Sequence, residues 1–173
     1  PVSERKRFFA QLTFTSGNWN AAQTATVTGV DDNLADGNQT TAVTLSVVDG
    51  SSDNDFDALA DQTVSVTTTD DDTTGFTLSG TNVTVTEAGS TATFTAVLGA
   101  QPASDVVLDI SSADTGEATA SPAQLTFSNG NWNAAQTVTV TGVDDSLTDG
   151  NQTTAVTLSI VDGSSDNAFD ALA

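Results

Sequence analysis

The chain has 173 residues, of which 37% are hydrophobic, and it carries 23 Asp and Glu against three Lys and Arg, a net charge of −20. Because proteins that bind DNA or RNA need a basic surface, this balance excludes nucleic acid as a partner. With no His and no Cys, the chain has no Ser-His-Asp or Cys-His nucleophile, no ordinary zinc site and no disulfide framework.

The first ten residues differ from the rest of the chain. They hold all the basic charge, at Arg5, Lys6 and Arg7. Residues 1–10 are therefore predicted to be a segment outside the repeats, either a join foreign to them or an N-terminal anchor. The chain begins with Pro and contains no Met, so we expect a piece of a longer protein whose export signal or anchor lies elsewhere. The sequence contains no run of about 18 apolar residues, so no membrane span is predicted.

A long internal duplication organises the sequence. Residues 11–60 match residues 124–173, 113 positions later, with 43 of 50 positions identical. This period exceeds those of solenoid repeats, so whole domains are repeated in tandem. We expect residues 11–72 to be the C-terminal part of one repeat, and residues 73–173 to be a second repeat that lacks its last strand.

Alternation of apolar and hydroxyl residues predicts strands throughout the chain, with no competing helical pattern. The expected strands of the second repeat are 82–87, 91–98, 105–110, 117–127 with an interruption at Pro122, 137–143 and 153–161. The first repeat adds a last strand at 62–69. The predicted fold is all-β, an antiparallel immunoglobulin-like sandwich of two sheets repeated in tandem and truncated at both ends. Without a last strand in the second repeat, strand 153–161 or its neighbour is expected to keep an open edge.

Acidic residues are predicted to meet at one end of this sandwich. Because successive strands run in opposite directions, the loops after strands 82–87, 105–110 and 137–143 lie at the same pole, as does the end of the last strand. Carboxylates gathered there without Lys or Arg need a divalent cation, and Ca²⁺ suits a site made of oxygen ligands alone. The candidate calcium ligands are Asp31, Asp32, Asp36, Asp70, Asp71, Asp72, Glu87, Asp114, Asp144, Asp145 and Asp149. The alternative is that these acids serve ordinary turns and solubility.

The segments 125–127, 136–140 and 143–153, followed in the first repeat by Asp70 to Asp72, resemble the Calx-beta family of sodium/calcium exchangers and bacterial surface repeats. The resemblance covers nearly the whole chain and implies a β-sandwich that binds calcium. In that family the acid of the first loop, the acids of the 143–153 loop and the final Asp run are calcium ligands. The resemblance assigns that role here to Glu87, Asp145, Asp149, Asp32, Asp36 and Asp70 to Asp72.

Other signals favour structural roles. The spacing of Asp53, Asp55 and Asp57 fails as an EF-hand because Ala58 and Val64 stand where that loop needs Gly and Glu. Trp132 lies in a Gly-Asn-Trp-Asn turn, where a ring can stack on a sugar but more often covers the end of a core. Paired carboxylates can hydrolyse glycosides, yet these acids fall on turn tips, so we expect no enzyme.

Together these observations predict a calcium-binding spacer repeat of a large secreted or cell-surface adhesin-like protein, stiffened by calcium where domains join. Its expected partners are the neighbouring repeats of the same polypeptide, and beyond them glycans or proteins of a cell surface. The alternative is a glycan- or ligand-binding sandwich that serves an enzyme elsewhere in the polypeptide.

Overall fold

The computed structural model describes residues 10–172, so the prediction for residues 1–10 lies almost wholly outside the described part. The chain divides into two compact units, residues 1–30 and residues 31–173. Residues 10–30 of the first unit contain a turn at 16–20, closed by hydrogen bonds between Asn18 and Thr15. Thr24 to Thr28, the counterparts of residues 137–141 in the predicted strand 137–143, adopt no regular structure.

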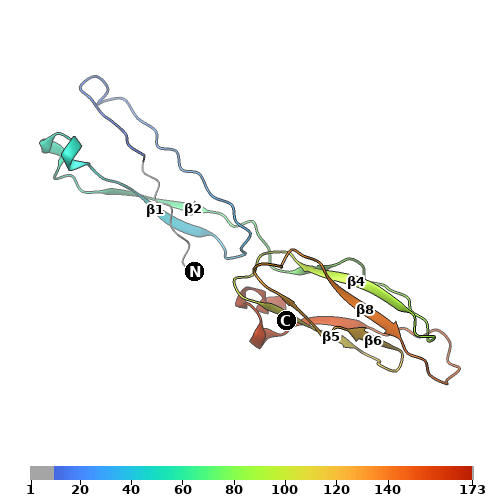
Figure 1. The fold of residues 1–173 in the computed structure, drawn as a ribbon. Coiled ribbons are helices and arrows are strands. Elements are labelled where there is room, and N and C mark those ends of the chain that lie inside the picture. Colours follow the sequence, from blue (N-terminus) through green and yellow to red (C-terminus); the bar gives the residue numbers. More distant parts are fainter. Residues whose placement is uncertain (1–9, 173) are drawn as a thin grey trace. The chain divides into compact units, whose positions relative to one another are not determined.

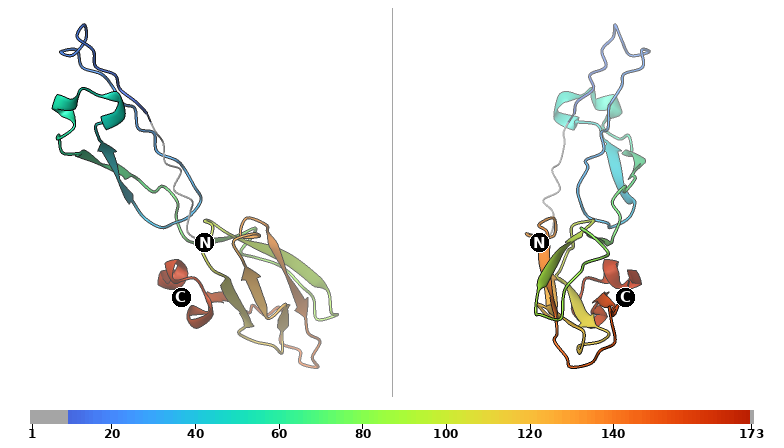
Figure 2. Two further views of the ribbon diagram at one scale, coloured as in Figure 1. Left: turned by 60° about the vertical axis from the view of Figure 1, so that its left-hand side comes forward. Right: turned by 90° about the vertical axis from the view of Figure 1, so that its right-hand side faces the viewer.

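The second unit contains nine strands in three antiparallel sheets, drawn in Figures 1 and 2. The strands are β1 (Gln39–Leu45), β2 (Gln62–Thr68), β3 (Phe76–Leu78), β4 (Thr91–Leu98), β5 (Val106–Ser112), β6 (Ala118–Ser121), β7 (Gln124–Phe127), β8 (Gln136–Gly142) and β9 (Val156–Ile160). Four short 3-10 helices complete it: η1 (Asp49–Ser51), η2 (Asn54–Phe56), η3 (Asp162–Ser164) and η4 (Asn167–Leu172). The sheets have the orders β1-β2, β3-β4-β8-β6 and β7-β5-β9.

The four-stranded and three-stranded sheets form the predicted sandwich over residues 76–160. Along β4, side chains alternate between exposed and buried positions, which places Phe94, Ala96 and Leu98 in the core. The facing strand β5 contributes Val106, Leu108 and Ile110 in the same way. Burial of these side chains is the main favourable term that holds the two sheets together.

One predicted strand is wrong. Residues 82–86 form no strand, and the strand that pairs with β4 is instead β3, at Phe76–Leu78. Val85 does pack against the core, which explains the misleading alternation, but Val83 is exposed. The backbone N–H of Thr86 donates to Ser90 Oγ, 2.7 Å away, so it bonds to a side chain and not to a strand ladder.

The predicted interruption at Pro122 separates two strands that belong to different sheets. β6 ends at Ser121 and pairs with β8, whereas β7 begins at Gln124 and pairs with β5. Proline has no N–H to donate to a ladder, so pairing stops there and the chain crosses from one layer to the other. The Ser121–Pro122 peptide bond is cis.

The first repeat contributes the sheet β1-β2, in which Val43 pairs with Val64 and Thr41 with Val66. Its apolar face is open: Val64 is 54% exposed. Burial differs in the same way at other equivalent positions, since Phe56 is 54% exposed and its counterpart Phe169 only 1%. The second repeat has a four-stranded sheet over this face, and residues 31–72 have none.

Within the second unit, residues 31–36 are tied to the second repeat. The Gln101 N–H donates to the Asn33 carbonyl over 2.7 Å, and Leu34 forms a parallel bridge with Gln101. The acidic loop after Val30 therefore lies against the turn between β4 and β5.

A buried carboxylate holds the opposite end of the same turn. Asp166 is 8% exposed, and it accepts hydrogen bonds from the Ser104 N–H at 2.7 Å and the Ala168 N–H at 2.9 Å. Burial alone would raise the pKa of Asp166, but these hydrogen bonds, with that from Ser104 Oγ, outweigh it and lower the pKa. Asp166 thus stabilises the fold above its unfolded pKa, and this stability is lost as pH falls through its folded value.

We expect Asp166→Asn to lower the free energy of unfolding at pH 7 by about 1–3 kcal/mol, because charged hydrogen bonds to two backbone amides are replaced by weaker ones. Chemical denaturation at pH 7 and at pH 3 checks this, and the loss in free energy of unfolding should be smaller at pH 3. Asp53→Asn is the matched control, since Asp53 is the exposed counterpart in the first repeat and bonds only to the Asp55 N–H. Equal losses in the two variants would contradict the assignment.

Candidate metal centre

The acidic loop has the same internal geometry in both repeats. In the second, Asp145 Oδ1 accepts from the Leu147 N–H at 2.7 Å and Gln152 Nε2 donates to the Asp149 carbonyl at 3.1 Å. In the first, Asp32 and Gln39 make the equivalent bonds to Leu34 and Asp36. The loop glycines adopt left-handed conformations, Gly37 with φ 74° and Gly150 with φ 77°, which L side chains rarely adopt. The repeated sequence therefore encodes a repeated loop.

This loop places carboxylates together at one end of the sandwich. Carboxylate oxygens of Glu117, Asp145 and Asp149 all lie within 4.8 Å of one another, and we name this set the tip cluster. Glu117 lies in the turn directly before β6, and its carbonyl accepts the Val143 N–H at 2.9 Å, which fixes the loop beside it. Glu117 and Asp145 are half-buried and Asp149 is exposed.

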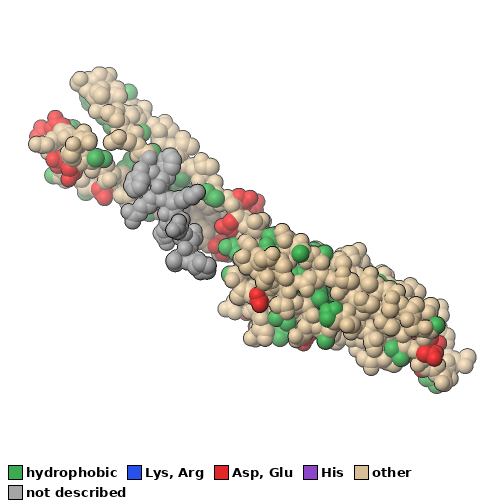
Figure 3. Space-filling model, viewed as in Figure 1, with side chains coloured by type: hydrophobic (Ala, Val, Ile, Leu, Met, Phe, Trp, Pro, Cys, Tyr) green, Lys and Arg blue, Asp and Glu red, His purple; other side chains and the backbone are tan. Residues whose placement is uncertain are grey.

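The surroundings of Glu117 confirm the predicted convergence of loops. Burial and then the charges of Asp149, Asp145, Asp114 and Glu87 raise its pKa above the ordinary value of 4.5. These neighbours come from the loops after residues 82–87, after β5 and after β8, as strand parity predicts. No Lys, Arg or His exists in residues 10–172 to balance them, and on the face drawn in Figure 3 the described residues show acidic but no basic side chains.

A second set lies in residues 31–72, close to the Asn33–Gln101 contact. Carboxylate oxygens of Asp31, Asp71 and Asp72 lie within 4.8 Å of one another, and we name this set the joint cluster. Burial, followed by the charges of Asp70, Asp71, Asp31 and Asp32, raises the pKa of Asp72. The cluster combines the loop after Val30 with the end of β2, two segments that strand parity predicts at the same pole.

Asp70 has a different role from its two neighbours. Its Oδ2 accepts from the Gly37 N–H at 2.6 Å, its Oδ1 from the Asp72 N–H at 2.9 Å, and its own N–H donates to Asn38 Oδ1 at 2.9 Å. These bonds, which we name the Asp70 clasp, join the end of β2 to the start of β1. Asp70 therefore holds Asp71 and Asp72 in position and is not itself a member of the joint cluster.

The structure divides the predicted ligands into two groups. Asp31, Asp71, Asp72, Asp145 and Asp149 belong to the two clusters. The others, Asp32, Asp36, Asp70, Glu87, Asp114 and Asp144, lie outside these sets of three. Glu117 is absent from the predicted ligands, because the alternation places it at the start of strand 117–127, and only Asp114 is predicted from the loop before it. Glu117 lies only three residues after Asp114, and this short distance is the signal in the sequence that points to it.

The donor set limits the chemistry of both clusters. They offer carboxylate oxygens only, which suit the hard cations Ca²⁺ and Mg²⁺ and not metals that prefer nitrogen or sulfur. Ca²⁺ accepts six to eight oxygens in flexible geometry, whereas Mg²⁺ demands a near-ideal octahedron. In each cluster, partly exposed carboxylates from two separate segments favour the more tolerant ion.

A close backbone contact holds the Glu87 loop in place. A Cβ on Gly142 would stand 2.2 Å from the Thr86 carbonyl oxygen, so β8 and the residue before Glu87 can approach this closely only because position 142 is glycine. The Gly142 N–H also donates to the Ser90 carbonyl at 3.1 Å. The position of Glu87 near the tip cluster thus depends on Gly142.

We therefore expect Gly142→Ala to destabilise the protein by about 1–3 kcal/mol through overpacking, a fall in melting temperature of about 4–24 °C for a domain of this size. Thermal denaturation followed by circular dichroism checks this. Gly163→Ala is the control, because a Cβ there meets no atom within 4 Å. A wild-type melting temperature for Gly142→Ala would show that the Glu87 loop is free to move.

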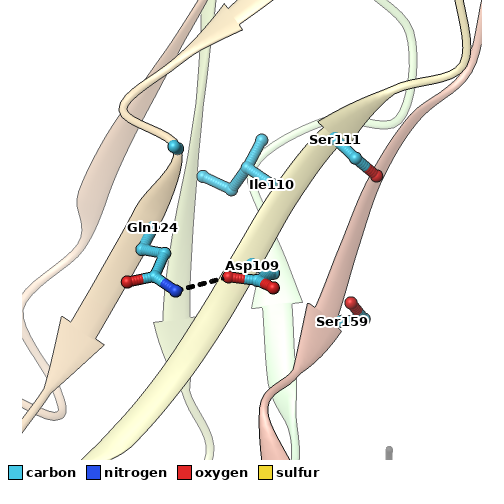
Figure 4. Close-up of a pocket in the computed structure, with 6 residues that line it drawn as sticks. Asp109, Ile110, Ser111, Gln124 and Ser159 are labelled. Atoms are coloured by element: carbon cyan, nitrogen blue, oxygen red, sulfur yellow. Dashed lines mark hydrogen bonds between the residues drawn. The ribbon is translucent and has the colours of Figure 1, made fainter.

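Two features of the described part of the sandwich bear on sugar binding. Trp132 packs against the core. A shallow depression on the three-stranded sheet is lined by Asp109, Ile110, Ser111, Ala123, Gln124 and Ser159, and Figure 4 shows Gln124 Nε2 donating to Asp109 Oδ1 at 2.6 Å. It has no aromatic ring on which a sugar could stack.

The fold and the clusters define a class of protein: tandem antiparallel β-sandwich repeats with acidic loops gathered at the ends of the domains. Comparison with known families gives the same answer, since residues 6–72 and 69–172 each match the Calx-beta domain. The chain belongs to the Calx-beta family. This is a non-catalytic repeat domain that is associated with calcium. No curated protein and no solved structure matched. Among the described residues, no helix has the length and apolarity to cross a membrane.

The raised pKa values predict how pH acts on the protein in chelator. A carboxyl whose folded pKa exceeds its unfolded value stabilises the fold below the unfolded pKa, and this stability is lost as pH rises through the folded pKa. Glu117 and Asp72 behave in this way. Acidification from pH 7 toward 5 should therefore raise the melting temperature until Asp166, with its lowered pKa, begins to lose its charge at lower pH.

At pH 7 in chelator, Glu117→Gln should raise the melting temperature, because it removes the charge that its neighbours repel. The same variant should show a smaller rise on addition of calcium. Differential scanning calorimetry checks both effects. Asp105→Asn is the control for net charge, since Asp105 is exposed and belongs to neither cluster. Identical behaviour of the two variants would count against a special role of Glu117.

Proposed function

We propose that this chain is a calcium-binding spacer of a large secreted or cell-surface protein of the adhesin type, in which calcium stiffens the joints between repeats. The observation that carries the proposal is the position of the joint cluster. Asp71 and Asp72 lie in the segment that leads from β2 into the second repeat, and their partner Asp31 lies two residues before Asn33, whose carbonyl accepts the hydrogen bond from the Gln101 N–H.

The stiffening follows from the charges at this joint. Without a cation, the carboxylates of the loop after Val30 and of the β2 end repel each other, and this repulsion opposes the packing of residues 31–36 on the turn that contains Gln101. A divalent ion that binds Asp31 together with Asp71 and Asp72 removes the repulsion and ties the loop to the interdomain segment. The loop after Val30 and the segment after β2, which both join the first repeat to the second, then move as one.

External calcium is present at concentrations that suit such sites. Extracellular calcium modules have dissociation constants of about 0.1–1 mM. At 10 mM calcium, each occupied site of this affinity adds roughly 1.4–2.7 kcal/mol of stability by mass action. The family's occurrence in extracellular or surface-exposed proteins agrees with this environment, as does a chain whose counterions must come from solution.

The alternative is a sandwich that binds glycans or other ligands for an enzyme elsewhere in the polypeptide. Its strongest candidate residue was Trp132, which packs against the core. An unchanged profile of Trp132→Ala on a glycan panel would remove this alternative.

Small-angle X-ray scattering of a protein with two complete repeats tests the spacer function. Calcium should narrow the distribution of interdomain distances relative to chelator, with data extrapolated to zero protein concentration. The double variant Asp71→Asn and Asp145→Asn should lose the response. Asp53→Asn with Asp55→Asn is the matched control, because both residues are exposed and lie outside the clusters. Equal dimensions with calcium and with chelator would end the proposal.

A further inference from the structure

Two short 3-10 helices, η3 and η4, pack on the second repeat directly after β9. Phe169 of η4 is 1% exposed and belongs to the core, so it fastens this segment to the sandwich. The Ser165 hydroxyl accepts from the Val107 N–H at 3.0 Å and adds a polar contact to β5. We name residues 162–172 the cap.

The cap holds three carboxylates at four-residue intervals, on Asp162, Asp166 and Asp170. Asp166 has a hydrogen bond to each of its oxygens, from the Ser104 and Ala168 N–H groups. Asp170 is half-buried, and its Oδ1 is buried without a hydrogen-bond partner among the described residues. A buried carboxylate oxygen that lacks a partner is costly when the group is charged. The structure therefore favours a neutral Asp170.

Asp162 supplies a partner for a neutral Asp170. The two carboxyl groups are close enough for a hydrogen bond, and this bond needs a proton on one of them, because ionised carboxylates can only accept. Burial, then the charge of Asp162, the hydrogen bond to Asp162 and the charge of Asp166 raise the pKa of Asp170 above its ordinary value of 3.8. Asp162 and Asp166 are the charged groups that face Asp170, since β9, which packs on η4, has no titratable side chain.

We propose that Asp162 and Asp170 share one proton, and that this proton holds the cap on the sandwich. With the proton in place, one acid donates to the other, and the buried oxygen of Asp170 belongs to a neutral group. When the proton leaves, two adjacent carboxylates repel each other and the cap loosens. The proton pair needs no calcium, so it can fail without the spacer function, and the spacer function can fail without it.

Two acids of the cap set opposite limits of pH. The pKa of Asp170 is raised, so its contribution to stability is present below the unfolded pKa and is lost as pH rises through the folded pKa. The pKa of Asp166 is lowered, so its contribution is present above the unfolded pKa and is lost as pH falls through the folded pKa. The cap is therefore most stable between the folded pKa of Asp166 and that of Asp170.

The cap also holds one end of the turn between β4 and β5. Asp166 accepts from the Ser104 N–H in this turn, and at the other end the Gln101 N–H donates to the Asn33 carbonyl. Pro102, between these two contacts, is fully buried. Loosening of the cap at high pH thus frees one end of the segment that binds Asn33. The shared proton should therefore also affect the Asn33–Gln101 contact.

Carboxyl carbon-13 NMR of the full 173-residue chain in chelator tests the shared proton. Asp162 and Asp170 should titrate as a coupled pair, and one of the two steps of the pair should lie well above the ordinary range for Asp. Asp49 and Asp57, their exposed counterparts in the first repeat, are the internal control and should show no coupling. Independent titration of Asp162 and Asp170 would overturn the proposal. A large shift of both resonances on addition of calcium would also overturn it, because a cation and not a proton would then join them.

A double-mutant cycle gives a second test. Asp170→Asn mimics the protonated acid and should raise the melting temperature at pH 7 by about 2–4 °C for a chain of this size. The rise should be smaller at pH 4, because the wild type then keeps its proton. Asp162→Asn relieves the same repulsion, so the double variant should gain nothing beyond Asp170→Asn.

The matched control for this cycle is Asp49→Asn with Asp57→Asn, since both residues are exposed in the first repeat. The effects of these two substitutions should be small and additive. Additive gains in the pair formed by Asp162 and Asp170, or equal gains from the two pairs, would contradict the shared proton.

Amide hydrogen exchange followed by NMR tests the hold of the cap on the turn. The protection factors of the Ser104 and Gln101 N–H groups should fall as pH rises from 5 to 8, and the fall should be smaller in Asp170→Asn. The Leu98 N–H, which donates to the Trp132 carbonyl outside this turn, is the control and should respond equally in both proteins. The same fall at Ser104 in the wild type and in Asp170→Asn would overturn the proposed role of the proton.

Discussion

The repulsion among carboxylates is the interaction on which both clusters depend. Sandwich topology sends alternate loops to one pole, and the acidic residues of this chain are concentrated in those loops. Residues 10–172 contain no cation that could balance them. Burial, followed by the charges of neighbouring carboxylates, raises the pKa of Glu117 and of Asp72. Within the described residues, this charge can be balanced only by ions from the surrounding solution.

The near-identical repeats show which features of the structure depend on the local sequence and which depend on the surrounding elements. The acidic loops form the same turns in both, because their hydrogen bonds are local: Asp to a backbone amide two residues on, and Gln back to a carbonyl. Burial is not local. Phe56 and Phe169 have the same sequence neighbours except at one position, yet only Phe169 has a second sheet to pack on.

This difference explains what could be predicted from the sequence. Strand β4 was predicted to the residue, since alternation on a half-buried strand is strong, and strand parity gave the meeting of loops at one pole. The prediction of a strand at 82–87 is wrong because the alternation of Val83 and Val85 says nothing about backbone hydrogen bonds, and the Thr86 N–H bonds to Ser90 Oγ. Glu117 and the Asn33–Gln101 contact depend on distances between segments far apart in the sequence, which no local pattern contains.

Strand pairing and cation binding are linked wherever one site draws carboxylates from two strands. In the first repeat the joint cluster combines Asp31 with residues that follow β2, and the Asp70 clasp fixes those residues. A cation that binds only the complete set favours the paired state, and by thermodynamic necessity pairing raises cation affinity by the same factor. A repeat built in this way can use one ion to fix its last strand and to hold the domain that follows.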